Sequence, residues 1–351
     1  MDLPGEKLVT RLWETIADKG IGSLLRPWQM RREGRARAEV NRDELLILAQ
    51  AEHDVQEIRL GHRSLLSDGS TVKAVGTGRG SVTAHVPPES NSLDSRLIAD
   101  FVSETTVAET LRQEINVAKA VLHAENELAE DRDEASSVRV DEDWLFRWRD
   151  SASTVSSEYL QQLWGKVLAG QIKSPNTFSL RTMEFLRNVS QDEAKQIEVL
   201  ATFVIEGCVY RDKEILDAAG AEFGFFLRMQ ELGLIIGVDA LGLERIFPSA
   251  EEASYARPLL GGVYALLVEH DDPAKVLKLP IYKVTPIGIQ ILALGTPQMS
   301  LKYLRSVGQA ICKQGYRVQL ARYEPVNELQ IRYFDSERIC PKPEQAAAIP
   351  A

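Results

Sequence analysis

The residues best suited to chemistry in this sequence form a run of arginines near its start. Five arginines and one carboxylate stand within residues 26–37, in a chain that carries more acidic than basic side chains. Guanidinium groups bind phosphate oxygens in nucleic acids and in anionic lipid headgroups. A tryptophan in the same run could stack on a base or lie at a membrane surface. The candidate phosphate-binding residues are Arg26, Trp28, Arg31, Arg32, Arg35 and Arg37.

A second explanation of this run stays open. The acidic stretch 125–134 of the same chain could pair with the arginines, because runs of charge are more often solvated surface than ligand sites. The sequence does not decide whether the basic segment contacts phosphate or the protein's own carboxylates.

The glycine run Gly76-x-Gly78-x-Gly80 is a weaker candidate for phosphate binding. A phosphate-binding turn needs a strand before it and a helix after it, whose N-terminus meets the phosphate. Residues 72–75 are a weak strand at best, and residues 81–83 begin no helix. The run is therefore predicted to belong to a linker.

Catalytic and metal-binding patterns do not emerge from the remaining residues. The five histidines have no metal-ligand spacing with one another or with cysteines and carboxylates. The acidic residues 141–143 are explained as the first turn of a helix, where the helix dipole favours negative charge. No serine nucleophile motif appears. We expect no cofactor and no metal, and the sequence leans against an enzyme.

Three cysteines, Cys208, Cys312 and Cys340, lie far apart in the chain. Their odd number and spacing disfavour both a zinc site and a disulfide framework, which predicts a reducing compartment and a cytoplasmic protein. The first residues lack the pattern of a signal peptide. No stretch approaches the ~20 apolar residues that a transmembrane helix needs.

Apolar periodicity predicts helices over most of the first 200 residues. Residues 5–60 favour a helix broken near residues 20–27, and residues 96–134 favour a second helix. An aromatic helix should begin after Asp141, and a helix with its apolar stripe over 160–168 should end at Gly170 as a C-terminal cap. The capping box at Ser190 predicts a further helix, which Gly207 should end.

The pattern shortens after residue 212. Two short helices and a strand at 234–236 are followed by a predicted strand pair, 262–268 with 275–284. A helix then begins at Thr285-Pro286. This order is typical of a winged helix. A last helix at 301–314 and strands at 316–323 and 328–334 complete the chain.

The expected fold class is mainly α with a smaller α+β part, with helical N-terminal and central regions followed by a winged-helix-like C-terminal module. The predicted domains are 1–66 (N-terminal helices with the basic segment), 67–95 (flexible linker), 96–190 (helical domain), 191–295 (winged-helix-like module), 296–338 (C-terminal helix plus strands) and 339–351 (disordered tail).

Composition limits the classes of partner. The chain has 351 residues, of which 44% are apolar, enough for a sizeable core and two or three domains. A net charge of -10 argues against binding nucleic acid over the whole surface, although a local basic patch remains compatible with it.

The candidate DNA-reading helix, residues 221–231, carries one arginine against two glutamates, so its aromatic face favours protein contact. Polar positions around the turn at 174–179 are a second place where a partner could bind. The candidate partner-binding residues are Phe223, Phe226, Arg228, Ser174 and Arg181.

Two resemblances add to this reading. The stretch Asp143-Trp144-Leu145-Phe146-Arg147-Trp148, the segments 163–170, 174–182 and 185–190, and residues 4–8 and 19–25 resemble a bacterial family, the domain of unknown function numbered 2806. That resemblance implies no reaction, cofactor or catalytic residue. Leu163–Ala169, Pro175 and Ser190 are similar to the abortive-infection alpha family, which implies a role in the response to phage.

These observations favour a non-enzymatic, partner-binding protein in a bacterial stress or phage-response setting. The partner would be another protein or a second copy of the chain. The alternative function is binding of nucleic acid or an anionic membrane through the 26–37 segment. An enzyme of unrecognised type is the third hypothesis.

Overall fold

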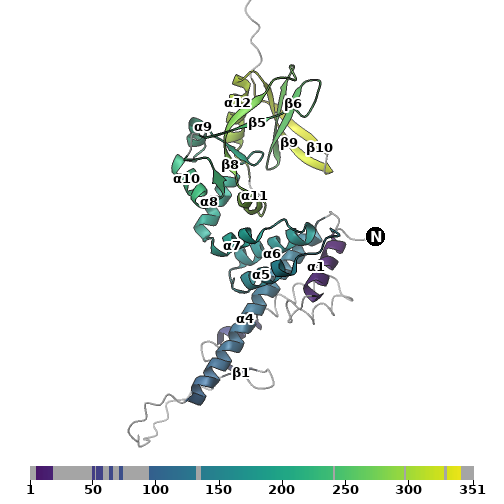
Figure 1. Ribbon diagram of the computed structural model, residues 1–351. Helices are drawn as coiled ribbons and strands as arrows, with labels where there is room; N and C mark the ends of the chain where they lie inside the picture. Colours follow the sequence, from purple (N-terminus) through teal and green to yellow (C-terminus); the bar gives the residue numbers. More distant parts are fainter. Residues whose placement is uncertain are drawn as a thin grey trace, which may run out of the picture. The chain divides into compact units, whose positions relative to one another are not determined.

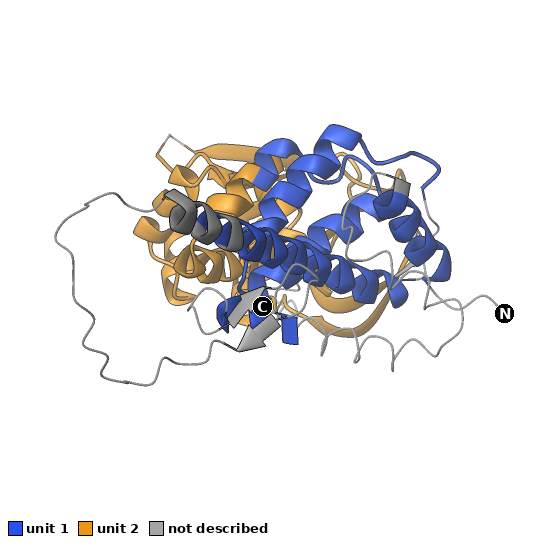
Figure 2. Ribbon diagram, turned by 90° about the horizontal axis from the view of Figure 1, so that it is seen from below, with its two compact units in different colours: residues 1–183 blue, residues 184–351 orange. Residues whose placement is uncertain are grey.

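The computed structural model describes residues 5–18, 50–51, 53–57, 63–65, 71–73, 95–131, 136–239, 242–295, 298–327 and 330–340. The chain divides into two compact units, residues 1–183 and 184–351 (Figure 2). The arginine run at 26–37 and the glycine run at 76–80 lie outside the described residues.

The first unit is built from helices, with one small hairpin (Figure 1). The long helix α4 packs against α1, α5 and α6. The hairpin gives a short paired strand inside the stretch expected to be a linker. The elements are α1 (Glu6–Asp18), β1 (Arg63–Leu65), β2 (Thr71–Lys73), α4 (Ser95–Ala129), α5 (Glu142–Ser153) and α6 (Glu158–Lys173), and α7 (Leu180–Asn188) crosses into the second unit.

Buried tryptophans join the helices of the first unit. Trp148 and Trp164 are almost fully buried, and the indole Nε1–H of Trp148 donates to the carbonyl oxygen of Trp164 at 3.0 Å. The Nε1–H of Trp144 donates to the carbonyl oxygen of Phe178 at 2.7 Å. The indoles of Trp144 and Trp148 therefore each combine a large apolar surface with a satisfied donor.

Two amide side chains connect α4, α5 and α6 within this core. Asn116 and Gln161 are both buried. The Asn116 Nδ2–H donates to the carbonyl oxygen of Ser153 at 2.7 Å, and the Gln161 Nε2–H donates to Asn116 Oδ1 at 3.2 Å. Buried amides need such partners, because an unpaired one costs free energy. Their pairing fixes the junction of the three helices.

The second unit begins with three helices and a four-stranded antiparallel sheet. Strand β8 lies between β3 and β4, and β5 also pairs with β8. The elements are α8 (Gln191–Ala201), β3 (Cys208–Tyr210), α9 (Lys213–Ala218), α10 (Phe223–Glu231), β4 (Ile235–Ile236), β5 (Leu243–Phe247), β8 (Leu277–Val284) and α11 (Pro286–Leu292).

A second four-stranded antiparallel sheet completes this unit. Its strand order is β10-β9-β7-β6, and α12 contacts β7 and β9. The elements are β6 (Tyr255–Gly261), β7 (Tyr264–His270), α12 (Leu301–Lys313), β9 (Arg317–Asn327) and β10 (Gln330–Arg338). The α+β part is therefore not a small addition, since it makes up the whole second unit, and the protein is mixed α and β.

The predicted helix starts are confirmed by their caps. The Asp141 carboxylate accepts from Trp144 N at the start of α5. Ser190 and Glu193 form the full capping box of α8. Thr285 caps α11, which has proline at its start. Local hydrogen bonds that a short sequence motif encodes are formed as expected.

Two predicted helix ends are wrong. Helix α6 continues through Gly170 to Lys173, and Gly170 serves packing instead, because a Cβ there would lie 2.6 Å from the Phe178 ring. Helix α8 ends at Ala201, well before Gly207. Gly207 has a φ of 69° and follows a separate turn.

The predicted strand pair is also wrong. Both strands exist, but β7 pairs with β6 and β9, whereas β8 pairs with β3, β4 and β5. The two strands thus belong to different sheets. Strand pairing depends on contacts distant in sequence, which apolar periodicity does not contain.

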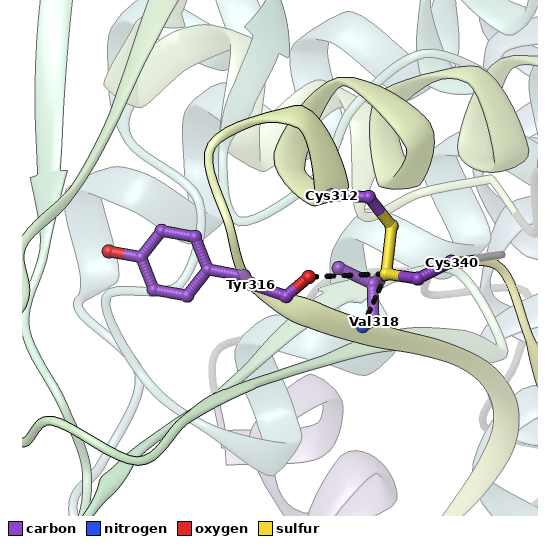
Figure 3. The surroundings of a disulfide bond; sticks show 4 residues. All are labelled: Cys312, Tyr316, Val318 and Cys340. Carbon is purple, nitrogen blue, oxygen red and sulfur yellow. Dashed lines mark hydrogen bonds between the residues drawn. A yellow bond between two sulfur atoms is a disulfide. The ribbon is translucent and has the colours of Figure 1, made fainter. Parts of the chain in front are cut away.

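The expectation against a disulfide is wrong as well, because Cys312 and Cys340 are joined, 28 residues apart (Figure 3). Cys340 and its neighbour Ile339 fall in the tail that was expected to be disordered, yet the Ile339 N–H donates to the Val318 carbonyl oxygen at 3.0 Å. Residues 341–351 lie outside the described part of the chain. Among the described helices, none has the length and apolar character that crossing a bilayer requires.

Candidate functional site

Helix α10 carries the sequence-predicted aromatic face, and it has two distinct sides. Phe225, Phe226 and Met229 are buried in the second unit. At 100° per residue these three positions fall on one side of the helix, so residues on the opposite side face outward. The helix therefore presents to solvent a different set of side chains from the one it buries.

Phe226 belongs to the core, so its assignment as a partner-binding residue is wrong. Its side chain is 1% exposed. Its ring lies 5.1 Å from that of Phe225, 5.4 Å from that of Tyr282 and 6.2 Å from that of Phe203. A partner could reach Phe226 only if α10 left the sheet. That would break this aromatic cluster, and aromatic side chains contribute much of the stability of a core.

Phe223 lies on the outer side of α10, with half of its surface exposed to solvent (50%). Gly224 and Arg228 of the same helix are also exposed, and a Cβ on Gly224 would meet no described atom within 4 Å. The Arg228 Nε–H donates to Gln196 Oε1 at 3.3 Å, which holds its stem toward α8. The solvent-exposed side of α10 thus carries an aromatic ring, a glycine with open space around it and a cation.

Acidic side chains flank this outer face. Glu222 occupies the N-cap position of α10 without capping the helix through its side chain, and Glu231 is exposed at the other end. Two carboxylates against the single guanidinium of Arg228 disfavour the phosphates that line a DNA groove. We name the exposed set Glu222, Phe223, Gly224, Arg228 and Glu231 the α10 face.

Ser174 and Arg181 are exposed in the first unit, as their prediction requires. The Ser174 N–H donates to the Gly170 carbonyl oxygen at 2.9 Å and so closes α6. The turn that follows contains Asn176, with a φ of 73°. Both residues lie in the first unit, whereas the α10 face lies in the second, so the five candidates do not form one described site.

A polar cavity between α4 and α6 was not identified from the sequence. It has a volume of about 450 Å³. The Nε2 of His123 lies 3.0 Å from Glu158 Oε1. Gly165 allows the two helices to approach, since a Cβ there would lie 2.5 Å from the Cβ of His123. The lining residues are His123, Asn126, Glu127, Glu130, Asp131, Gln162 and Lys166.

The lining of the cavity suits a cationic or hydrogen-bonding group. Three of its seven lining side chains are carboxylates and one is a lysine. None of the seven is a serine, threonine or cysteine that could act as a nucleophile. Groups of three or more metal-ligating side chains are absent from the described part of the chain.

A sequence signal for this cavity did exist. Residues 123, 126, 127 and 130 are polar and follow helical spacing, which places them on one stripe of α4.

Comparison with known proteins relates part of the chain to a family. No curated protein and no solved structure matches the chain. The segment that does match a family runs from α4 to the residues just after β4, so it contains both the cavity and the α10 face. Residues 103–238 match the model of a protein family of unknown function (DUF2806), which confirms the resemblance that the sequence suggested.

Proposed function

We propose that this is a non-enzymatic, partner-binding protein whose second unit contains a winged helix that binds protein through the α10 face. The observation that carries the proposal is the half-exposed ring of Phe223 on the third helix of that module. Aromatic and arginine side chains are enriched in the hot spots of protein interfaces, and α10 exposes one of each.

The order of elements supports the winged-helix assignment. The chain order of the relevant elements is α8, β3, α9, α10, β4 and, after an insertion, β8. In the sheet, β8 lies between β3 and β4. In a winged helix the third helix enters the DNA groove. Here β5, β6 and β7 stand between β4 and β8, so the connection that would form the wing is greatly enlarged.

Charge supports a protein partner over DNA. A groove-reading helix approaches two rows of phosphates and needs basic or neutral polar side chains. Glu222 and Glu231 stand at the two ends of α10, where they would face those phosphates. A protein surface with an apolar pocket and a basic rim would accept the same side chains.

The setting follows from the abortive-infection likeness. Leu163–Ala169, Pro175 and Ser190 carry that likeness, which supports the proposal of a role in a phage or stress response in a bacterial cytoplasm. The disulfide bears on this location, because disulfides in the cytosol are rare and are most often transient or redox-sensing.

Binding of nucleic acid or an anionic membrane through residues 26–37 is the second candidate. The observation that favours it is five arginines in twelve residues of an acidic chain. Replacing them with glutamine should abolish salt-dependent retention on duplex DNA, RNA or anionic vesicles. Unchanged retention, or none by the native protein, would remove this candidate.

Photo-crosslinking tests the protein-binding proposal. Benzoylphenylalanine at Phe223, incorporated in the native host, should yield a reproducible protein adduct on irradiation. The same group at Val263, which is 55% exposed at the turn between β6 and β7, is the matched control. An adduct at 223 but not at 263 supports the proposal. The absence of an adduct at 223, equal adducts at both sites, or an adduct with nucleic acid contradicts it.

A further inference from the structure

The disulfide between Cys312 and Cys340 fastens the end of the last strand to a helix (Figure 3). Cys312 lies near the C-terminus of α12, and Cys340 follows β10 by two residues. Helix α12 packs against β9, the strand next to β10. The bond therefore closes a loop that contains the whole β9–β10 hairpin.

Few other interactions hold the end of β10 in place. The pairing with β9 shifts register between Phe334 and Glu337, and only Glu337 and Arg338 pair with β9 after the shift. The Glu337 carboxylate also accepts from Arg305 of α12 at 2.9 Å, an exposed ion pair. Such exposed pairs contribute little stability.

Ile339 adds packing against α12. A Cβ on Gly308 would lie 2.4 Å from Cδ1 of Ile339, so the glycine makes room for this side chain. The backbone of Ile339 donates to the Val318 carbonyl oxygen at 3.0 Å. Residues 337–340 thus form a short segment, which we name the strand end, that these few contacts and the disulfide attach to β9 and α12.

The surroundings of Cys340 accommodate its sulfur in either oxidation state. The Val318 N–H lies 3.1 Å from Sγ and can donate to it in both states. The Tyr316 carbonyl oxygen lies 3.2 Å from the same sulfur. A disulfide sulfur has no hydrogen to donate, whereas a thiol would donate to that oxygen. The site therefore offers the reduced cysteine a hydrogen bond that the oxidised one lacks.

Both cysteines of the disulfide are partly exposed to solvent. Cys312 and Cys340 are each partly exposed, whereas the third cysteine, Cys208, is buried at 3% exposure. Thiol–disulfide exchange requires that a thiolate approach one sulfur directly. Cys208 is therefore an internal reference for a thiol that solvent does not reach.

We propose that Cys312 and Cys340 form a reversible thiol–disulfide site that controls attachment of the strand end to α12. A thiolate of a reductant of the glutathione or dithiol class attacks one sulfur, the S–S bond breaks, and a mixed disulfide forms. A second thiolate displaces it, so the reductant leaves as its own disulfide. Two electrons and two protons pass to the cysteines. The proposal does not depend on the α10 face.

Thiol trapping on the folded full chain tests this site. The protein is equilibrated in glutathione buffers of increasing oxidised fraction, alkylated with a maleimide, and its mass is measured. Residues 312 and 340 should gain and lose labelling together, while Cys208 should label only after denaturation. Reduction should also remove amide exchange protection at residues 337–340 and leave β7 protected.

Three results would overturn the proposal. The pair could stay oxidised until a denaturant unfolds the chain, it could fail to form in oxidised glutathione, or its reduction could leave exchange at residues 337–340 unchanged. A double variant, Cys312→Ser with Cys340→Ser, should match the reduced protein in every buffer. A Cys208→Ala variant should respond as the native chain does, and the trapping on native protein needs no variant.

Discussion

Two glycines with opposite surroundings show how single residues set packing in this protein. Both lie in helices, where alanine is favoured over glycine by up to about 1 kcal/mol. Gly165 lies against α4, where a Cβ would be 2.5 Å from the Cβ of His123 and 3.0 Å from the Ala120 carbonyl oxygen. Gly224 has open space at the same position.

The Gly165→Ala substitution should therefore lower the free energy of unfolding by about 1–3 kcal/mol, the usual cost of overpacking a tight contact. The Gly224→Ala substitution should leave it unchanged or raise it by up to about 1 kcal/mol. Chemical denaturation of both variants measures the difference. Equal effects of the same sign would contradict the helix contact described for α4 and α6.

The three phenylalanines of α10 show that residue type alone does not predict which side chains are buried. Phe223, Phe225 and Phe226 are alike in sequence, yet the first is half-exposed and the other two are buried. The helical period distinguishes the exposed phenylalanine from the two buried ones once the buried side of α10 is known. The sequence of this nine-residue helix does not identify the buried side, because apolar residues lie on several sides. The packing of Phe226 on Tyr282 of β8, a contact distant in sequence, decides it.

At the scale of elements, the capping box of α8 makes a prediction about pH. Hydrogen bonds from Ser190, first from its backbone N–H and then from its hydroxyl, lower the pKa of Glu193 below its ordinary value of about 4.5. The folded state therefore favours the charged carboxylate. The resulting stabilisation is fully present above pH 4.5 and is lost as pH falls through the lowered pKa.

The Glu193→Gln variant keeps a side chain that can complete the capping box but removes its charge. It should be less stable than the native protein at pH 7, and the difference should shrink as pH falls below the ordinary carboxyl range. Thermal unfolding at a series of pH values measures this. A difference that stays constant down to pH 2 would show that the charge of Glu193 does not act as described.

Elements also mark the limit of prediction from the sequence. Helix starts at Asp141, Ser190 and Thr285 were predictable because a cap is formed by residues within four positions of one another. The helix end at Gly170 was predicted wrongly, since that glycine accommodates the Phe178 ring across a turn. Sheet membership of β7 and β8 and the Cys312–Cys340 bond depend on segments distant in the chain.

At the scale of the whole molecule, the chain divides into two compact units. The second has its own core, in which Phe226, Tyr255 and Tyr303 are among the largest fully buried side chains. A core of this kind allows a domain to fold alone. The matched family segment, residues 103–238, ends before β5, so it includes helices α8, α9 and α10 but not the second sheet.

A fragment of residues 189–340 should therefore fold by itself, because it retains the cap of α8 and both sheets. We expect a cooperative thermal transition and near-ultraviolet circular dichroism from its buried tyrosines. A fragment cut at residue 238, where the family match ends, lacks β8 and should not unfold cooperatively. Cooperative unfolding of the fragment that ends at residue 238 would contradict the requirement for β8 in the core.

The proposed binding of a protein partner concerns the whole molecule, and it rests on the α10 face. An aromatic residue at the centre of an interface commonly contributes enough that its loss weakens binding by about tenfold or more. Phe223 is half-exposed, so its replacement should not affect the fold. Val263, equally exposed on the turn between β6 and β7, is the matched control position.

The most direct measurement is the affinity of the Phe223→Asp variant for the protein that photo-crosslinking identifies, titrated beside native protein and Val263→Asp. We predict that binding weakens by about tenfold or more for Phe223→Asp alone, with the unfolding temperature of both variants unchanged. Native affinity in Phe223→Asp, or an equal loss in both variants, would contradict binding through the α10 face.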